Sequence, residues 1–377
     1  MMRPNRRHLI ILAVALAVVT VSAVGVSALT FNVESALQIG QTSRWAILDG
    51  GAWAKIEGGL LRFLSPDSQE LQKLDLKGSQ FIVAPTGGLV VGVISYADPQ
   101  PKNLDALAFD LYDVTGRRLA HLESPRLSSA IVAPSGTAFV GIDGAEGLPF
   151  SVLRFFDGQG NVRDTLAVDR FEGGRFSSDG SRFFFVTAKD GLCVRDLANT
   201  SLDQIGRVEH WAASADGRMI VTAANGNISC FKDGKLVTSF AWRADSIPLR
   251  AVSISPDGVY AAAISALHAA VFRTDSSALI WKVASGESSW NLRSVDLRNG
   301  LSLVAVGLDY DPGPDSADRH TRSRCDVYDR AGRLVHSEED QPEKWGAYYP
   351  VVRFDETRGG LVFISRDRFK YIKIGLP

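Results

Sequence analysis

Residues 251–264 read AVSISPDGVYAAAI, and this stretch decides the fold of the 377-residue chain. Its centre is the tetrapeptide Ser255-Pro256-Asp257-Gly258, with runs of apolar and β-branched residues on both sides. Proline presets a turn, serine or aspartate caps it, and glycine supplies a position with positive φ. The stretch therefore predicts two short strands joined by a tight turn.

The same turn recurs along the chain at a nearly constant period. A run rich in β-branched and aromatic residues follows the copies, and successive turn glycines are separated by 37 to 49 residues. Self-similarity at this period, with no convincing amphipathic helix between copies, is typical of an all-β repeat. The copies are Ala84-Pro85-Thr86-Gly87, Ala133-Pro134-Ser135-Gly136, Ser177-Ser178-Asp179-Gly180, Ser214-Ala215-Asp216-Gly217, Ser255-Pro256-Asp257-Gly258 and the degraded Leu297-Arg298-Asn299-Gly300.

Four strand-like runs fall in each unit of about 40 residues, which matches the blade of a β-propeller better than any other all-β repeat. One blade is too small to bury both of its faces, so blades pack radially and share a core. Third-strand signals favour eight blades; seven is the rival, because residues 44–77 form the least regular unit. The last unit lacks a fourth strand, and we expect the segment from Val33 to Ile39 to supply it and close the ring. The third-strand signals lie near Leu61, Phe109, Leu153, Cys193, Ser229, Val271, Val327 and Tyr371.

The turns carry a resemblance to known propellers. Ser255-Pro256-Asp257-Gly258 resembles the turns of WD-repeat-like propellers, while Asp113-Val114-Thr115-Gly116 and the segment from Asp275 to Trp281 resemble those of quinoprotein-like propellers. The resemblance covers most of residues 44–377. The Gly-His and Trp-Asp dipeptides of true WD repeats do not recur, and the adjacent cysteines typical of quinoprotein dehydrogenases have no counterpart. The resemblance therefore implies the fold and carries over no activity.

The charge balance excludes one class of function. The chain has 41 Lys and Arg residues against 42 Asp and Glu, so no basic excess drives binding to nucleic acid or to an anionic membrane. Three cysteines are too few for a disulfide framework. Cys193, Cys230 and Cys325 occupy similar places in third strands of different units, which predicts buried packing residues. No nucleotide-binding, hydrolase or zinc motif occurs, and we predict no cofactor.

The first 30 residues have the pattern of an export segment. Three arginines within the first seven residues precede an uncharged run from Leu9 to Leu29, and a positive flank of this kind stays on the cytoplasmic side. The small-residue sites Val21-Ser22-Ala23 and Val26-Ser27-Ala28 favour a cleaved signal peptide, whereas the length of the run allows an uncleaved membrane anchor. Either outcome places the propeller domain, residues 31–377, outside the cytoplasm, as a secreted, periplasmic or membrane-anchored protein.

Long insertions are predicted between the second and third strands of three units, at 96–106, 143–149 and 308–323. Loops carry function on a rigid scaffold, so the face with these insertions is the candidate binding surface, and simple tolerance of loop growth is the alternative. In the last insertion the carboxylates of Asp309, Asp311 and Asp315 are candidate oxygen ligands for calcium. Their spacing does not match an EF-hand loop, and a solvated acidic loop is the alternative reading.

Five further residues are candidate contacts for a partner. Asp318 and His320 lie in the last insertion. Trp242, Trp290 and Trp345 fall in or near links between units, where exposed aromatic rings would anchor an interface. Packing between blades is the alternative for the three tryptophans.

Two functions of different classes follow. The first is a non-catalytic scaffold that binds a protein or peptide partner in the cell envelope. The second is a propeller enzyme, either a carbohydrate-active hydrolase or lyase or a quinone-dependent dehydrogenase, with catalytic groups from several blades at the channel mouth. A cluster of carboxylates with His or Arg at that mouth would favour the enzyme, and small or apolar side chains there would favour the scaffold. The sequence names no catalytic residue.

Overall fold

The computed structural model describes most of the chain between Thr30 and Gly375. Over the described residues the secondary structure consists of β-strands and one short 3-10 helix, η2 (Asn299–Leu301), which confirms the all-β prediction. The predicted N-terminal apolar helix lies outside the described residues. Those left undescribed are 1–29, 39–43, 48–52, 58–59, 66–68, 76–79, 84–89, 97–106, 114–117, 125–126, 134–137, 144–149, 243–246, 287–288, 312, 314–321, 341–349, 357–358, 366–367 and 376–377.

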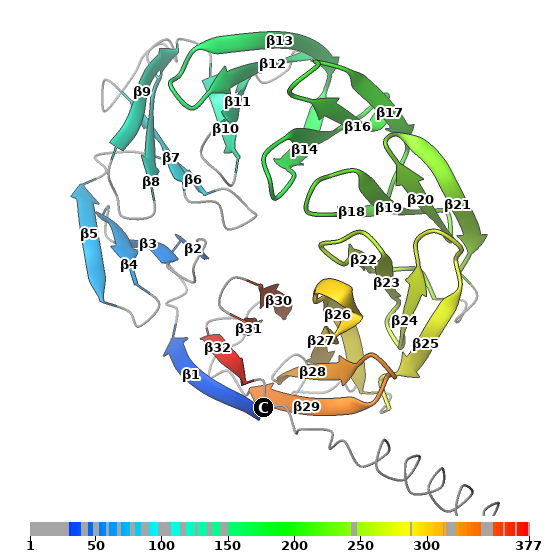
Figure 1. Cartoon of the computed structure of the whole chain (residues 1–377). Helices are drawn as coiled ribbons and strands as arrows, with labels where there is room; N and C mark the ends of the chain where they lie inside the picture. The colour runs from blue at the N-terminus through cyan, green and yellow to red at the C-terminus, as the bar shows by residue number, and fades with distance from the viewer. Residues whose placement is uncertain are drawn as a thin grey trace, which may run out of the picture.

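The strands assigned in the described ranges form eight sheets of four antiparallel strands, arranged around a common axis (Figure 1). We call each sheet a blade. From the axis outward, seven blades take their strands in chain order. These are β2 (Arg44–Ile47), β3 (Trp53–Glu57), β4 (Leu60–Leu64) and β5 (Glu70–Asp75); β6 (Gln80–Val83), β7 (Val90–Tyr96), β8 (Leu107–Asp113) and β9 (Arg118–Ser124); β10 (Leu127–Val132), β11 (Ala138–Asp143), β12 (Phe150–Asp157) and β13 (Val162–Asp169); β14 (Phe171–Phe176), β15 (Arg182–Thr187), β16 (Gly191–Asp196) and β17 (Leu202–Gly206); β18 (His210–Ala213), β19 (Met219–Ala224), β20 (Asn227–Lys232) and β21 (Lys235–Ala241); β22 (Ala251–Ile254), β23 (Tyr260–Ile264), β24 (His268–Arg273) and β25 (Leu279–Ala284); and β26 (Trp290–Leu297), β27 (Leu303–Tyr310), β28 (Ser323–Asp329) and β29 (Leu334–Asp340).

The remaining blade joins the two ends of the chain. Its inner strands are β30 (Val351–Asp355), β31 (Gly360–Ser365) and β32 (Arg368–Gly375), and its outer strand is β1 (Thr30–Gln38). β1 pairs antiparallel with β32, from Thr30 opposite Gly375 to Gln38 opposite Arg368. The prediction that an N-terminal strand completes the last blade is therefore confirmed. All eight predicted third-strand positions also lie in strands next to the outer strand of their blade.

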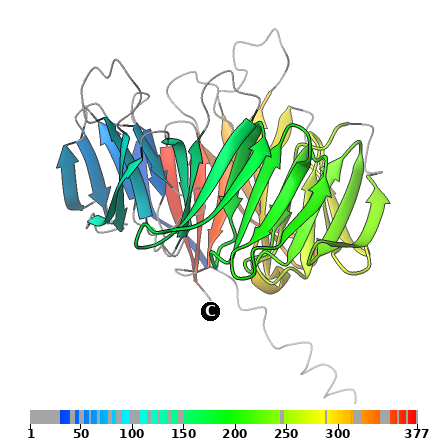
Figure 2. The ribbon, with the colours of Figure 1, turned by 90° about the horizontal axis from the view of Figure 1, so that it is seen from above.

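The two faces of the ring differ in their connections. The turn face carries the connections from first to second strands and from third to outer strands, so each outer strand begins there. The loop face carries the connections from second to third strands. Figure 2 shows the ring edge-on, with the C-terminus on the turn face and η2 on the same side.

The serine–aspartate turns are held by one repeated hydrogen-bond pattern. In the turn at 255–258, the Ser255 hydroxyl donates to the Asp257 carboxylate at 2.5 Å and accepts the Tyr260 N–H at 3.0 Å. The same carboxylate oxygen accepts the Val259 N–H at 3.1 Å. Equivalent bonds occur in the turns at 177–180 and 214–217. This local chemistry explains why the turn recurs as a sequence motif.

Neighbouring turns also bind one another. The Asp179 N–H donates to the Ala215 carbonyl at 3.1 Å, and the Ala215 N–H donates to the Pro256 carbonyl at 2.9 Å. The Asp257 carboxylate extends the chain of contacts, because it accepts the Gly300 N–H at 3.1 Å. The turns of four consecutive blades are therefore connected by hydrogen bonds on the turn face.

We predict that Asp257→Ala lowers the free energy of unfolding by about 3 kcal/mol, because hydrogen bonds to a charged acceptor contribute about 1.5–3 kcal/mol. Asp216→Ala is the matched control. Asp216 accepts the same two bonds within its own turn, at 2.6 and 3.0 Å, from Ser214 and Arg218. Urea unfolding of both variants should show the larger loss at Asp257, which also binds Gly300. Equal losses would show that the bond between blades contributes nothing.

Apolar clusters lie between adjacent blades. One unites β23, β24 and β25 with β26 and β27 around Trp290, Leu292 and Val304. Another unites β27 and β28 with the last blade around Ala305, Val327 and Phe363. β27 therefore buries side chains toward both neighbouring blades, Val304 toward one and Ala305 toward the other, as a radial repeat requires.

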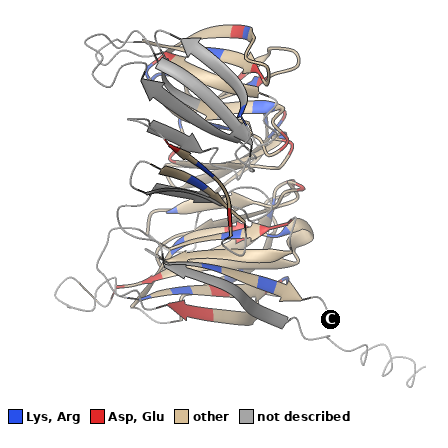
Figure 3. Cartoon of the chain, turned by 90° about the vertical axis from the view of Figure 1, so that its left-hand side faces the viewer, with Lys and Arg blue, Asp and Glu red and all other residues tan. Residues whose placement is uncertain are grey.

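Charged residues are spread over the blades rather than gathered by sign. Figure 3 shows Lys and Arg interspersed with Asp and Glu along the described strands on one side of the ring. This arrangement matches the near balance of 41 basic and 42 acidic residues in the sequence. Any charged site must therefore arise from a local arrangement of a few side chains.

Candidate interaction surfaces

The last insertion is shorter than predicted and stands on a rigid stem. Leu308 and Tyr310 belong to β27, and Ser323 opens β28 opposite Asp309, so only residues 311–322 form the loop. The expected boundaries 308–323 are corrected because ladder pairing continues further than the polar sequence suggested. Leu308 is 1% exposed. The loop begins and ends on the loop face.

Arginine–aromatic stacking builds this stem. The Arg322 guanidinium lies 4.0 Å from the centre of the Tyr310 ring and 5.4 Å from that of Trp290. The rings of Trp290 and Tyr310 meet edge to face at 5.3 Å, and Arg324 lies 4.6 Å from the Trp290 ring. Cation–π contacts of this kind fix a flexible arginine in place. The loop therefore leaves the propeller from a defined position.

Two of the three proposed calcium ligands, Asp309 and Asp311, lie in the described residues. Asp309 is 4% exposed and forms an ion pair with Arg293 at 3.3 Å. Asp311 accepts a hydrogen bond from the Asn291 amide at 3.4 Å. Asp315 lies outside the described residues. Among the residues that the structure describes, no group of three His, Cys, Asp or Glu side chains could hold a metal ion.

The structure describes two of the five candidate partner contacts, Trp242 and Trp290. Trp290 is 2% exposed and packs in the core between blades, so the expectation of an exposed anchor is corrected at this residue in favour of inter-blade packing. Trp242 is partly buried and packs against the cluster around Val221 and Leu249. Asp318, His320 and Trp345 lie outside the described residues.

The innermost strands carry a charged layer that the sequence analysis missed. Each member stands two residues before the residue that pairs across the turn between first and second strands with the residue five positions further on, as at Ser177, Ser255 and Arg298. Reading two residues upstream of the serine turns finds Arg175, Ala212 and Ser253, whereas the degraded copy Leu297-Arg298-Asn299-Gly300 is offset by one residue. The members are Arg175, Ala212, Ser253, Asp296 and Arg353, on five consecutive blades, and we call them the inner layer.

Two cations of the inner layer repel each other. The Arg175 guanidinium lies 4.1 Å from the centre of the Trp211 ring on the next blade. Burial lowers the pKa of Arg175 to about 10, and the positive charge of Arg353 acts in the same direction. Arg175 remains protonated at neutral pH, so this part of the inner layer is a site of positive potential.

Asp296 is the carboxylate of the inner layer, and it links three blades. It accepts the Phe354 N–H at 2.8 Å and the Ser253 hydroxyl at 3.2 Å. Burial raises its pKa to about 6, against these hydrogen bonds and the charge of Arg353, which lower it. Among the five members of the inner layer, Asp296 is the one carboxylate.

We predict a pH signature for Asp296. Its folded pKa of about 6 exceeds the ordinary 3.8, so its neutral form is favoured in the folded state and its contribution to stability falls as pH rises from about 4 to 6. Asp296→Asn removes the titration. The free energy of unfolding of the wild type relative to this variant should fall by up to about 3 kcal/mol between pH 4 and pH 7. Urea unfolding at each pH measures both proteins. A difference in free energy of unfolding between them that does not change with pH would contradict the prediction.

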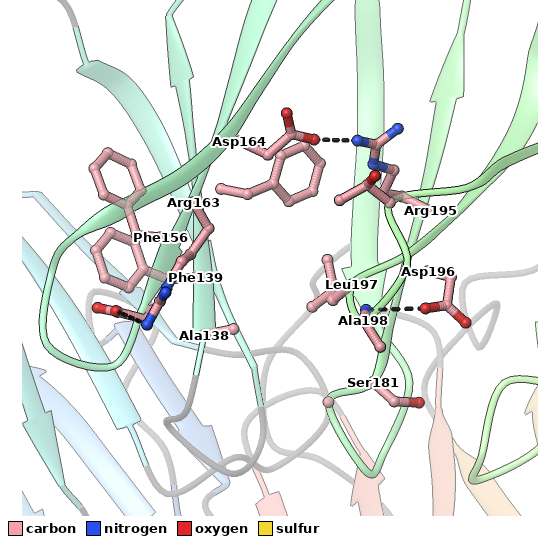
Figure 4. Close-up of a pocket in the computed structure, with 14 residues that line it drawn as sticks. Ala138, Phe139, Phe156, Arg163, Asp164, Ser181, Arg195, Asp196, Leu197 and Ala198 are labelled. Atoms are coloured by element: carbon pink, nitrogen blue, oxygen red, sulfur yellow. Dashed lines mark hydrogen bonds and ion pairs between the residues drawn. The ribbon is translucent and has the colours of Figure 1, made fainter.

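A cleft of about 580 Å³ opens between the blade of β10–β13 and the blade of β14–β17 (Figure 4). The stacked rings of Phe139 and Phe156, 4.5 Å apart, form part of its lining. Arg195 is paired with Asp164, and Arg163 is paired with Asp157 at 2.7 Å. These charges neutralise one another, so the cleft offers mainly apolar surface.

The cysteines match their prediction. Cys193, Cys230 and Cys325 are free and buried, and burial raises the pKa values of the first two to about 11 and 12. Their thiols are therefore protonated at neutral pH and unreactive.

In the described residues, no helix is long and apolar enough to cross a membrane.

Comparison with known proteins places the fold. No protein-family model and no curated protein matches the chain. Among solved structures, the C-terminal WD40 domain of Sif2 matches 93% of this chain and 100% of its own, with a TM-score of 0.57 and 13% identity. The match to KlHsv2 with loop 6CD replaced by a Gly-Ser linker covers 78% of this chain and 96% of KlHsv2, with a TM-score of 0.53 and 13% identity. The match to Hsv2 of Kluyvelomyces marxianus covers 79% of this chain and 96% of that protein, with a TM-score of 0.50 and 13% identity.

Proposed function

The fold described above is a WD40-like β-propeller, and from it we propose that the chain is an exported, non-catalytic interaction scaffold. In this proposal eight blades form a closed ring, and the loop face binds a protein or peptide partner in the cell envelope. The observation that carries the proposal is the partly exposed pair of Arg322 and Tyr310 beneath the longest insertion, which the buried Trp290 ring supports. Arginine and aromatic side chains held rigidly at a surface are the residue types that dominate binding energy at protein interfaces.

The N-terminal sequence supports export. The uncharged run from Leu9 to Leu29 follows three arginines and ends one residue before β1 begins at Thr30. Cleavage after Ala23 or Ala28 would leave β1 intact, and so would retention of the run as an anchor. Both forms keep the strand that closes the ring, which fits an extracytoplasmic propeller.

The inner layer supports binding rather than catalysis. In the described residues it combines small Ala212 and Ser253 with one carboxylate, Asp296, which already accepts two hydrogen bonds. Arg175 and Arg353 add positive charge to the layer, and the charge of Arg353 acts on Asp296. Such a layer suits an anionic group of a bound partner better than hydrolysis of a glycosidic bond, which uses a pair of carboxyl groups.

The test is to shorten the insertion. We expect replacement of residues 312–321 by Asn-Gly, between Asp311 and Arg322, to preserve folding because the stem contacts remain. Capture of a partner from envelope extracts should fall about tenfold or more, as expected for loss of a central contact. Arg322→Ala should reduce capture in the same direction without removing the loop.

The matched control is Lys189→Ala, an exposed residue in another connection on the loop face. It should leave capture unchanged. Unaltered capture by both the shortened protein and Arg322→Ala would show that the partner does not bind at this stem and would overturn the assignment.

A further inference from the structure

Exposed aliphatic side chains form a belt around the rim of the turn face. Each lies at the first or second residue of an outer strand, just after the turn that enters it. Their exposures range from 45% to 63%. Every outer strand begins on the turn face (Figures 1 and 2), so these residues lie at the same end of their blades. The belt consists of Leu71, Val162, Leu202, Leu236, Leu279 and Leu334.

The N-terminal segment joins the propeller at the level of this belt. β1 is the outer strand of its blade, and Thr30 is its first residue, opposite Gly375 at the end of β32. Thr30 therefore occupies the same position in its blade as Val162, Leu202 and Leu279 occupy in theirs. The uncharged run ends at Leu29, so no linker separates it from the belt.

The length of the run fixes how close the belt lies to a bilayer. Residues 9–29 span about 31 Å as a helix at about 1.5 Å per residue, and the hydrocarbon core of a bilayer is about 30 Å thick. A helix of this length that crosses the hydrocarbon core leaves no residues of the run outside it. Thr30 then begins at the lipid interface, within a few ångströms of the headgroups, because one residue reaches at most about 3.6 Å.

We propose that the turn face lies flat against the outer surface of the membrane, with the belt in contact with lipid. The proposal rests on the exported state proposed above, in the form that retains residues 9–29. It explains why apolar residues recur at one level of the rim. The loop face, with its stem at Arg322, then points away from the membrane and is open to a partner.

The chemistry beside the belt fits a lipid interface. Arg163, Lys235 and Arg333 stand directly next to Val162, Leu236 and Leu334 in the sequence. The side chains of Arg163 and Arg333 are 71% and 70% exposed, and they form ion pairs with Asp157 at 2.7 Å and with Asp329 at 2.6 Å. Aliphatic side chains with adjacent cations that reach the headgroups are typical of surfaces in contact with a bilayer. A flat bilayer also meets all positions of a planar rim at once. A second copy of the chain would not be placed at this level by the N-terminal run.

The test uses single cysteines in the full chain, reconstituted in phosphatidylcholine vesicles. Buried native cysteines leave an introduced thiol as the site of labelling. We choose Leu334→Cys, in the blade adjacent to that of β1, and Leu202→Cys, in the blade on the opposite side of the ring (Figure 1). Lys189→Cys lies in the same blade as Leu202, but on the loop face, and is the matched control. An environment-sensitive fluorophore at each site is exposed to lipids with a nitroxide near the headgroup.

The proposal predicts vesicle flotation and severalfold stronger quenching at positions 202 and 334 than at 189. Quenching at 334 alone would mean a tilted ring and would overturn it. A blue-shifted fluorophore at 202 that nitroxide lipid does not quench would mean that protein covers the belt, which also overturns it. Absence of flotation, with a mature N-terminus at Val24 or Leu29 by mass spectrometry, would overturn the anchored form while leaving an exported scaffold in place.

Discussion

Gly191→Ala is expected to lower the free energy of unfolding by about 4 kcal/mol, the sum of a strained backbone and an overpacked site. Gly191 has φ +71°, a conformation that alanine adopts only at a cost. A Cβ there would overlap the carbonyl of Gly206 and lie 2.7 Å from the amide nitrogen of Arg207. All of these neighbours are backbone atoms of the link to the next blade, so none can turn aside. Urea unfolding measures the loss.

Gly226→Ala separates the two causes. Gly226 has φ +72°, almost the same as Gly191, and also lies in a connection on the loop face. A Cβ at Gly226 would have nothing within 4 Å. Its substitution should therefore cost about 1 kcal/mol from the backbone alone. Equal losses in the two variants would contradict the close approach of the chain at Gly206.

Trp290→Ala should produce the second large effect, a loss of about 4 kcal/mol, because it empties a fully enclosed site in the core between two blades. Trp290 is 2% exposed and contacts the Tyr310 ring and two arginines. The loss should appear as a lower midpoint of urea unfolding with an unchanged dependence on urea. Residue 290 would then be structural, a support for the stem rather than a contact of the partner.

Trp242→Ala is the control for this prediction. Trp242 is only partly buried, so its truncation removes less enclosed surface and should cost about 1–2 kcal/mol. A loss at Trp290 no larger than that at Trp242 would contradict the enclosed position of the Trp290 ring. Partner capture by each folded variant, measured well below its midpoint, reports binding separately from stability.

Local chemistry made the repeat predictable from the sequence. The serine, aspartate and glycine of each turn form hydrogen bonds within four or five residues, as in Ser255, Asp257 and Gly258. The motif can therefore be recognised in the sequence without knowledge of the fold. The third strands were predicted for the same reason, since a polar turn follows each apolar run. The closing strand β1 followed from counting strands in the last blade.

Features that depend on ring closure were not predicted. Arg175 and Arg353 are 178 residues apart in the chain, and only the circular arrangement of blades brings their charges into one layer. The burial of Trp290 depends on neighbours from β27 and β28 rather than on its own segment. The belt was missed because one exposed leucine per unit is ordinary, and only the shared level of the six makes a surface.

A disulfide across the closing strands tests the central claim, a ring of blades shut by the two ends of the chain. Asn32 and Lys373 are opposite each other in the ladder of β1 and β32. Asn32→Cys with Lys373→Cys should form a disulfide under mild oxidation and raise the resistance to urea. Ala36→Cys with Lys373→Cys, displaced by about 10 Å along the strand, should not, because Cα atoms more than about 7 Å apart cannot be bridged. Equal cross-linking of both pairs, or of neither, would contradict the closed ring.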